Sequence, residues 1–227
     1  KQKASCRNSK NAKFAVAICD HKNGYQRLNY FGEFKSGGIC IMNYLNKISL
    51  KDAIEFIVDN RGKSVPTSEK GIALIATNCI NNKSLFPEFK NVRYISEETF
   101  NNWFRAHPRP DDIIFTLKGS QNGAACLVPE IVNFAIAQDM VALRANKKIM
   151  DPYFLLAVLR SKEVQYAIKS LDVSDVIPHL KKGDFDKLLL PRPSLEIQKS
   201  IGKFFITLER KIELNRQMNQ TLEAMAQ

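Results

Sequence analysis

The sequence predicts an α+β fold in which a globular domain of short strands and flanking helices is followed by one long C-terminal helix. The chain has 227 residues, of which 44% are hydrophobic and 25% are charged, a composition typical of a folded domain with its own core. Short apolar runs bounded by turn residues predict strands, and after Pro193 the only Gly or Pro is Gly202. We therefore divide the chain into an N-terminal extension of unknown role (1–41), a globular domain (42–193) and a helix (194–227).

The chain carries a formal net charge of +11, and more than half of this excess lies in residues 1–41. A positive excess favours an acidic partner, of which nucleic acid is the commonest. The alternative is a charge that serves solubility alone. Because no stretch of about 18 apolar residues occurs and no secretory signal is visible, we expect a cytoplasmic protein with no membrane partner.

Residues 1–41 are expected to form a basic hairpin. Phe14, Val16 and Ile18 alternate as in a half-buried strand. The segment Asp20–Gly24 ends in an Asn-Gly pair that suits a tight turn, and Tyr25–Phe34 can return as a second strand. The alternative is a non-native leader, because a more regular pattern begins at Met42. We assign no function to this segment.

Ser49 begins the first helix expected in the globular domain. Its side chain can cap the helix, and Asp52 lies in the first turn, where the helix dipole favours an acid. An apolar stripe at helical spacing supports this helix; its members are Leu50, Ala53, Ile54, Ile57 and Val58. A polar loop is expected from residue 59 to Pro66, followed by a buried strand at Ile72–Ala76.

The middle of the domain combines a short helix with a hairpin. Ser96 can cap a helix that carries Phe100, Trp103 and Phe104 on one face. Ile113–Leu117 and Ala124–Val128 are apolar runs joined by the polar tip Lys118–Gly123, a pattern that predicts a hairpin.

The rest of the domain is expected to hold two strands and a helix. Met140–Arg144 and Leu188–Leu190 are the strands. Asp151 and Pro152 open the helix, as cap and first residue. Its apolar positions are Leu155, Val158, Leu159, Val164 and Ile168.

From Ser194 to Gln227 a heptad pattern extends over about four heptads and predicts a coiled coil. The expected interface with a partner helix comprises Ile201, Phe204, Leu208, Ile212, Asn215, Met218 and Leu222. Lys211, Met225 and Phe205 complete or widen the same stripe, and the polar seam residues lower stability while fixing register. The alternative is a helix that packs only on its own domain.

The sequence holds no recognisable catalytic or metal motif. The five cysteines match no disulfide framework or CxxC pair, so we expect reduced thiols, and the set Cys6, Cys19, His21 and Cys40 lacks the close ligand pairs of structural zinc sites. Asp151–Phe154 lacks the second proline of the amino-methyltransferase motif Asp-Pro-Pro-Tyr. Pro110–Asp111 matches only the first half of a metal-dependent nuclease motif, and a turn at Asp111–Asp112 explains it better. We expect a binding protein that is not an enzyme and needs no metal or cofactor.

The order of several short motifs resembles the specificity subunit of type I restriction-modification systems. The resemblance covers about Lys47 to Gln227 and corresponds to one target recognition domain followed by its spacer helix. The first matching stretches are 57–63 and 94–98, followed by 111–116, which leads to Gly119, Ser120 and Gly123. The later ones are Gln138, then 153–156 together with 159–161, and finally 190–193 together with 196–201. The chain departs from the family at Asp172–Ser174, where a Gly-Thr turn is usual, and residues 1–41 match nothing in it. A full subunit carries two recognition domains, so the chain is expected to be a fragment, a truncated product or a half-subunit that dimerises.

The resemblance implies a twisted mixed or antiparallel sheet with flanking helices, and a function in bacterial defence. The recognition domain would read one half of a bipartite target in double-stranded DNA. The spacer helix would pair with a second recognition domain's helix, or with a second copy, and dock the DNA methyltransferase (modification) subunits. S-adenosylmethionine and ATP would belong to the modification and restriction subunits, and this chain would hold no catalytic residue.

The residues favoured for DNA contact lie in three polar loops. They are chosen because Lys and Arg bind phosphates, while amide and basic side chains read base edges. They are Arg61, Lys63, Lys118, Ser120, Gln121, Asn122, Lys181 and Lys182. For each residue, a solvated position without DNA contact stays open. Two other functions also stay open: a methyltransferase or nuclease that acts alone, and a basic coiled-coil oligomerisation protein that binds DNA weakly and without sequence specificity.

Overall fold

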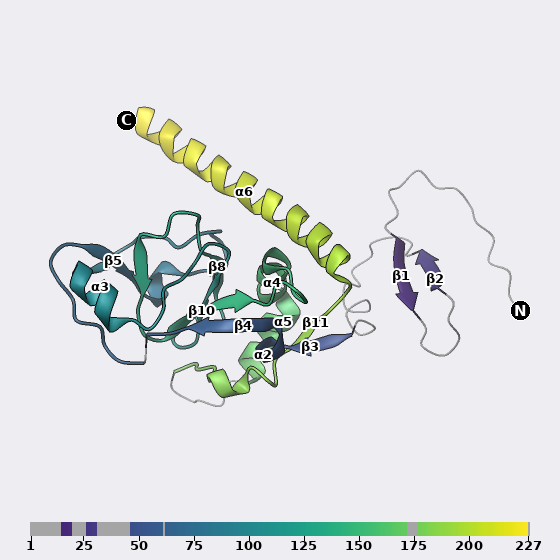
Figure 1. Ribbon diagram of the computed structural model, residues 1–227. Helices are drawn as coiled ribbons and strands as arrows, with labels where there is room; N and C mark the ends of the chain where they lie inside the picture. Colours follow the sequence, from purple (N-terminus) through teal and green to yellow (C-terminus); the bar gives the residue numbers. More distant parts are fainter. Residues whose placement is uncertain (1–14, 20–25, 31–45, 61, 172–176, 227) are drawn as a thin grey trace, which may run out of the picture. The chain divides into compact units, whose positions relative to one another are not determined.

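The computed structural model describes residues 15–19, 26–30, 46–60, 62–171 and 177–226 (Figure 1). The chain forms two compact units, Lys1–Tyr44 and Leu45–Gln227. In the first unit, β1 (Ala15–Cys19) pairs antiparallel with β2 (Gln26–Tyr30). The two strands of the expected hairpin are therefore present, whereas its turn at Asp20–Gly24 lies outside the described residues.

A four-stranded antiparallel sheet forms the centre of the second unit. Its order is β4-β10-β7-β8, with β4 (Ile54–Val58), β10 (Met140–Ala145), β7 (Ile113–Thr116) and β8 (Ala125–Leu127). Alternate side chains of these strands enter two different cores, as the twofold repeat of a strand requires. Phe115 and Leu143 pack in one core, and Ile114 and Ala142 pack in the other. Burial on both faces explains why β8, and β7 up to Thr116, consist of apolar residues.

Helices cover one face of this sheet and a second sheet covers the other. The helical core includes buried residues of α4 (Pro152–Leu159) and α5 (Lys162–Ser170). The second sheet has the order β6-β5-β9, with β5 (Ile72–Ile75) parallel to β9 (Phe134–Ile136) and antiparallel to β6 (Arg93–Ile95). Its Ile75 and Phe134 share a core with Ile114. The mixed α+β fold is thus confirmed.

Several shorter elements complete the second unit. Ser96 caps α3 (Glu97–Trp103) by accepting from the Thr99 amide, as expected. The 3₁₀ helices η1 (Thr77–Cys79) and η2 (Lys182–Asp184) lie in loops. β3 (Lys47–Ser49) pairs with β11 (Leu189–Pro191), which places the start of this unit beside the entry to α6 (Leu195–Met225). Among the described helices, none has the length and apolar character needed to cross a membrane.

The helix expected at the start of the domain is wrong beyond its first turn. Ser49 does cap a helix and accepts from the Asp52 amide, but α2 (Leu50–Ala53) is only four residues long. Ile54–Val58 instead forms β4, with Ile57 opposite Leu143 of β10. β-branched and aromatic side chains favour an extended backbone once a neighbouring strand is available, so the pairing with β10 prevails over the helical spacing.

The single helix expected from Asp151 to Ile168 is also wrong, since it is two helices. Asp151 caps α4 by accepting from the Phe154 amide at 2.9 Å, as expected. The chain then leaves the helix at Arg160, and Ser161 caps α5 by accepting from the Val164 amide at 3.3 Å. Serine competes for backbone hydrogen bonds and favours caps over helix interiors, so it starts a new helix here.

Candidate nucleic-acid interface

The polar loops of the central sheet emerge together, at the same end of its strands. Val58 lies opposite Ala142 near the end of β4, Met140 of β10 lies opposite Thr116 of β7, and Phe115 of β7 lies opposite Ala125. Because neighbouring strands are antiparallel, the loops after β4 and β7 and the turn before β10 emerge together. We call this region the loop edge; it comprises the described residues of 59–64, 117–124, 138–139 and 177–182.

The segment 177–182, which is the third of the loops from which DNA contacts were predicted, contacts the other two. Lys182 forms an ion pair with Asp59 of the first loop. The Leu180 amide donates to the Leu117 carbonyl at 2.8 Å, and the Gly119 amide donates to the Pro178 carbonyl at 3.0 Å. Residues distant in the sequence are therefore held side by side, although Arg61 itself lies outside the described residues.

The hairpin tip has a backbone fixed by hydrogen bonds. The Thr116 hydroxyl donates to the Gln121 carbonyl and accepts from the Ala124 amide. Gly123 has a positive φ of 82°, and a Cβ there would lie 3.0 Å from Ile168 Cγ2 of α5, so the tip fits closely on that helix. A fixed backbone lowers the entropy lost when a ligand binds.

The predicted contact residues differ in how far they are open to a ligand. Lys63, Ser120, Gln121, Lys181 and Lys182 are exposed, and Lys118 is half-buried. Lys182 already holds Asp59. Asn122 is half-buried, and its buried Oδ1 atom has no hydrogen-bond partner. The amide oxygen of Asn122 therefore does not face solvent, whereas Ser120 and Gln121 present their side chains outward.

The long helix α6 is fastened to the globular domain along one face. Gln198 donates to the carbonyls of Ile149 and Pro193 and accepts from the Asp151 amide. Gly202 fits so closely that a Cβ would lie 2.4 Å from Asp151 Oδ1. Figure 1 shows α6 running along one side of this unit, with α4 beneath its first turns. We call this the inner face; it comprises Gln198, Gly202, Phe205, Ile206, Glu209 and Arg216.

Farther along, the inner face is held by two arginines. Arg160, whose side chain is 6% exposed, donates to Glu209 at 2.9 Å and also to the carbonyls of Ala125 and Ser84. Burial lowers the pKa of Arg160, and the neighbouring Glu209 carboxylate opposes that shift. Arg216 donates to the Lys83 carbonyl at 2.7 Å. Both arginines therefore serve the attachment of α6.

Another side of α6, which borders the inner face, carries the seam predicted from the heptad pattern. Its exposed fractions run from 43% at Ile212 to 68% at Phe204, and Asn215 is exposed as well. We call the seven predicted residues the outer seam: Ile201, Phe204, Leu208, Ile212, Asn215, Met218 and Leu222. The helix thus packs on its own domain with one face and still leaves an apolar stripe uncovered.

Comparison with known proteins identifies the family. The model of the type I restriction modification DNA specificity domain matches residues 46–224, which covers most of the chain. The chain belongs to this family.

Two curated relatives are similar to this specificity domain. This chain is 29% identical over 151 residues to the type I restriction enzyme HindI specificity subunit of Haemophilus influenzae. The match covers 65% of this chain and 32% of the relative. This chain is 32% identical over 109 residues to the MjaVIII specificity subunit of Methanocaldococcus jannaschii, covering 48% of this chain and 24% of the relative. The matched part of this chain thus spans about a third or less of these relatives.

A solved structure supports the fold. A chain from a study of complex assembly and conformational transition of the type I R-M system has a TM-score of 0.52 at 17% identity. The match covers 79% of this chain and 46% of that chain.

The acidic residues at the nuclease-like motif have structural partners in this specificity domain. Asp112 accepts two hydrogen bonds from Arg144, and this partner raises the pKa of the guanidinium. Asp111, at the expected turn, accepts from the Tyr153 hydroxyl at 3.0 Å and from Lys147 at 3.1 Å. In the described part of the chain, no three His, Cys, Asp or Glu side chains gather as a metal site would require.

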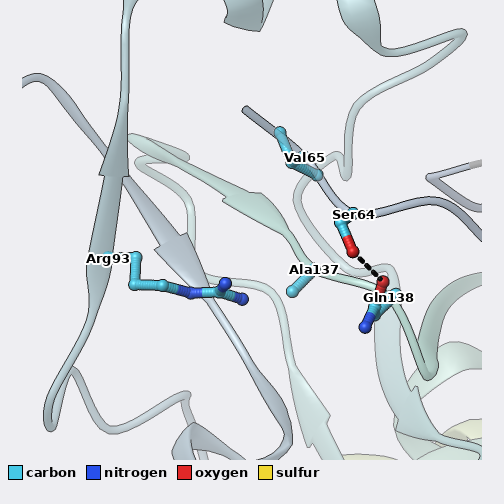
Figure 2. Close-up of a pocket in the computed structure, with 5 residues that line it drawn as sticks. All are labelled: Ser64, Val65, Arg93, Ala137 and Gln138. Carbon is cyan, nitrogen blue, oxygen red and sulfur yellow. Dashed lines mark hydrogen bonds between the residues drawn. The ribbon is translucent and has the colours of Figure 1, made fainter. Parts of the chain in front are cut away.

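Sequence reasoning missed a shallow pocket that borders the loop edge. Ser64, Val65, Arg93, Ala137 and Gln138 line it (Figure 2). Ser64 follows β4 and Gln138 precedes β10, so both belong to the loop edge, whereas Arg93 comes from β6. β6 is only three residues long, too short for a periodic signal, and nothing in the sequence links residue 93 to residues 64 and 138.

Proposed function

We propose that this specificity domain reads one half of a bipartite target in double-stranded DNA through its loop edge. The observation that carries the proposal is the convergence of three polar loops at one edge of the central sheet in a chain of this family. Lys63, Lys118 and Lys181 supply cations suited to phosphates, and Ser120 and Gln121 supply groups suited to base edges.

The outer seam supports the second part of the proposal. An exposed apolar stripe along a 31-residue helix is suited to burial against another helix. We assign it to the spacer helix of a second recognition domain, or to a second copy of this chain, in an assembly that also docks the methyltransferase subunits. The distance between half-sites would follow from the length of the paired helices.

The chemistry is assigned to partner subunits. The modification subunit would bind S-adenosylmethionine and transfer the methyl group, and the restriction subunit would use ATP when the complex cleaves DNA. This chain would act in the cytoplasm as a non-catalytic recognition component, with no cofactor of its own.

Selection from a randomised duplex library at physiological salt tests the proposal. The purified chain, alone and with a cognate modification subunit, is expected to recover one short motif, and to do so more strongly with the subunit present. Uniform recovery of all sequences, weakening together as salt rises, would contradict it and favour a basic oligomerisation protein. Methyl transfer or cleavage by the purified chain alone would contradict the non-catalytic assignment.

A further inference from the structure

Arg93 is an exposed arginine whose side chain has no partner among the described residues. It lies on β6, an edge strand of the second sheet, opposite Leu74 of β5. Within the part of the chain that the structure describes, its guanidinium makes no hydrogen bond, ion pair or ring contact. Figure 2 shows its side chain extended from the strand toward Ala137, with Gln138 beyond. Its five N–H donors are therefore free for a ligand.

The neighbours of Arg93 in the pocket are held in place by the fold. The Ser64 hydroxyl donates to Gln138 Oε1 at 3.3 Å, which ties the loop after β4 to the turn before β10. Val65 and Ala137 are buried and belong to the small apolar core under the second sheet. With its oxygen engaged by Ser64, the half-buried Gln138 amide has two N–H donors that find no partner among the described residues. The pocket thus presents donors from two side chains on a firm apolar base.

We propose that this pocket reads one base pair of the DNA target and that Arg93 contacts its guanine. The inference rests on the proposed function and assigns a specificity-determining residue to it. In the major groove, guanine presents two acceptors, N7 and O6, and the guanidinium fork can bind both at once. Adenine presents a donor at N6, and that donor would face the donors of Arg93. The arrangement of donors therefore favours G·C over A·T at this position.

The position of the pocket agrees with this role. Ser64 and Gln138 belong to the loop edge, so a duplex bound along Lys63, Ser120 and Gln121 would pass beside it. A phosphate contact is the competing use of Arg93, and it would carry no sequence information. Substitutions of Arg93 that keep or remove the positive charge separate these two uses.

The test compares wild type with R93A, R93K and Q138L in the randomised duplex selection, together with affinity for a nonspecific duplex. R93A is expected to lower the preference for one base pair by about 10- to 100-fold, as loss of a bidentate base contact does, and to keep the rest of the motif. Q138L, which leaves the Arg93 fork in place, is expected to lower the preference for the same base pair by a smaller factor. R93K is expected to retain the nonspecific affinity and lose most of the guanine preference, because one ammonium cannot reproduce the fork. R105A, which removes an exposed arginine that lies outside the pocket, is the matched control and is expected to retain the full motif.

Three results would overturn the inference. If R93A recovers the wild-type motif at every position, Arg93 reads no base. If it weakens all sequences equally while R93K restores binding, Arg93 contacts a phosphate. Both results leave the proposed function standing. If wild type itself recovers no motif, the proposed function fails and this inference fails with it.

Discussion

The inner face of α6 and the loop edge both carry many polar side chains, but they use them in opposite ways. On the inner face, Arg160 is almost fully buried and donates to three oxygens. At the loop edge and its pocket, Ser120, Gln121 and Arg93 are exposed, and their side chains have no partner among the described residues. Buried polar groups need partners, whereas exposed ones are satisfied by water until a ligand replaces it. The first region therefore holds the fold, and the second is open to a ligand, which we propose to be DNA.

The largest loss of stability is expected from R160A, which removes the arginine that joins the inner face of α6 to the globular domain. The variant leaves the Glu209 carboxylate and two carbonyls without their donor, and breaking a buried ion pair costs about 3–5 kcal/mol. Denaturant unfolding of the variant should show this loss of stability. R216A is the control: its side chain is 42% exposed, so a cost of about 1 kcal/mol or less is expected. Equal losses of unfolding free energy in the two variants would mean that the buried arginine contributes no more to stability than the exposed one.

Variants of the outer seam should weaken association and spare folding. Burying a leucine contributes about 1.5–3 kcal/mol, so L208N and L222N should each weaken pairing with a second helix about tenfold or more. Because both side chains are exposed, unfolding of the isolated chain should change by only about 0.5 kcal/mol. Sedimentation equilibrium measures the association. L214N, at an exposed leucine outside the seven seam residues, should weaken association less. A loss of affinity as large as that of L208N would show that the pairing interface lies on a different face of α6.

G202A is expected to lose stability, though less than R160A. The added methyl group would lie 2.4 Å from Asp151 Oδ1 and 2.8 Å from the Phe154 amide nitrogen. Both atoms belong to the capped start of α4 and cannot move freely, so overpacking should cost about 1–3 kcal/mol, despite a gain of about 1 kcal/mol in helix propensity. G183A, which has open space around its Cβ position, is the control in thermal unfolding and should be nearly neutral. A stable G202A would indicate that α6 can shift along α4.

The elements that the sequence predicts correctly are those whose signal is local. Ser96 and Asp151 act as caps because the side chain and the amide that it accepts from are three residues apart. The hairpin of β7 and β8 follows from two apolar runs around a glycine-bounded tip. The long helix α6 follows from the absence of breakers and the heptad pattern.

The elements that the sequence misses depend on contacts between distant segments. Ile54–Val58 has helical spacing and becomes a strand only because β10 lies beside it. The candidate site shows the same limit: the exposed lysines and amides could be named from their loops, but Asn122 turns partly inward and Lys182 pairs with Asp59. Arg93 joins Ser64 and Gln138 only in three dimensions. Local chemistry predicts which residues can bind, and the topology decides which of them meet.

Variants of the loop edge should affect DNA binding while changing folding as little as those of the outer seam. K63Q and K181Q remove exposed charges, so unfolding should change by only about 0.5 kcal/mol. Each lost phosphate contact should lower the slope of log affinity against log salt by about one unit, with similar weakening on every sequence. Titrations of DNA at several salt concentrations measure this slope. K199Q and K203Q, at exposed positions of α6, remove the same charge away from the loop edge and should leave the slope unchanged. If both pairs of variants lower it equally, DNA binding follows overall charge, and the contrast between the two regions does not extend to function.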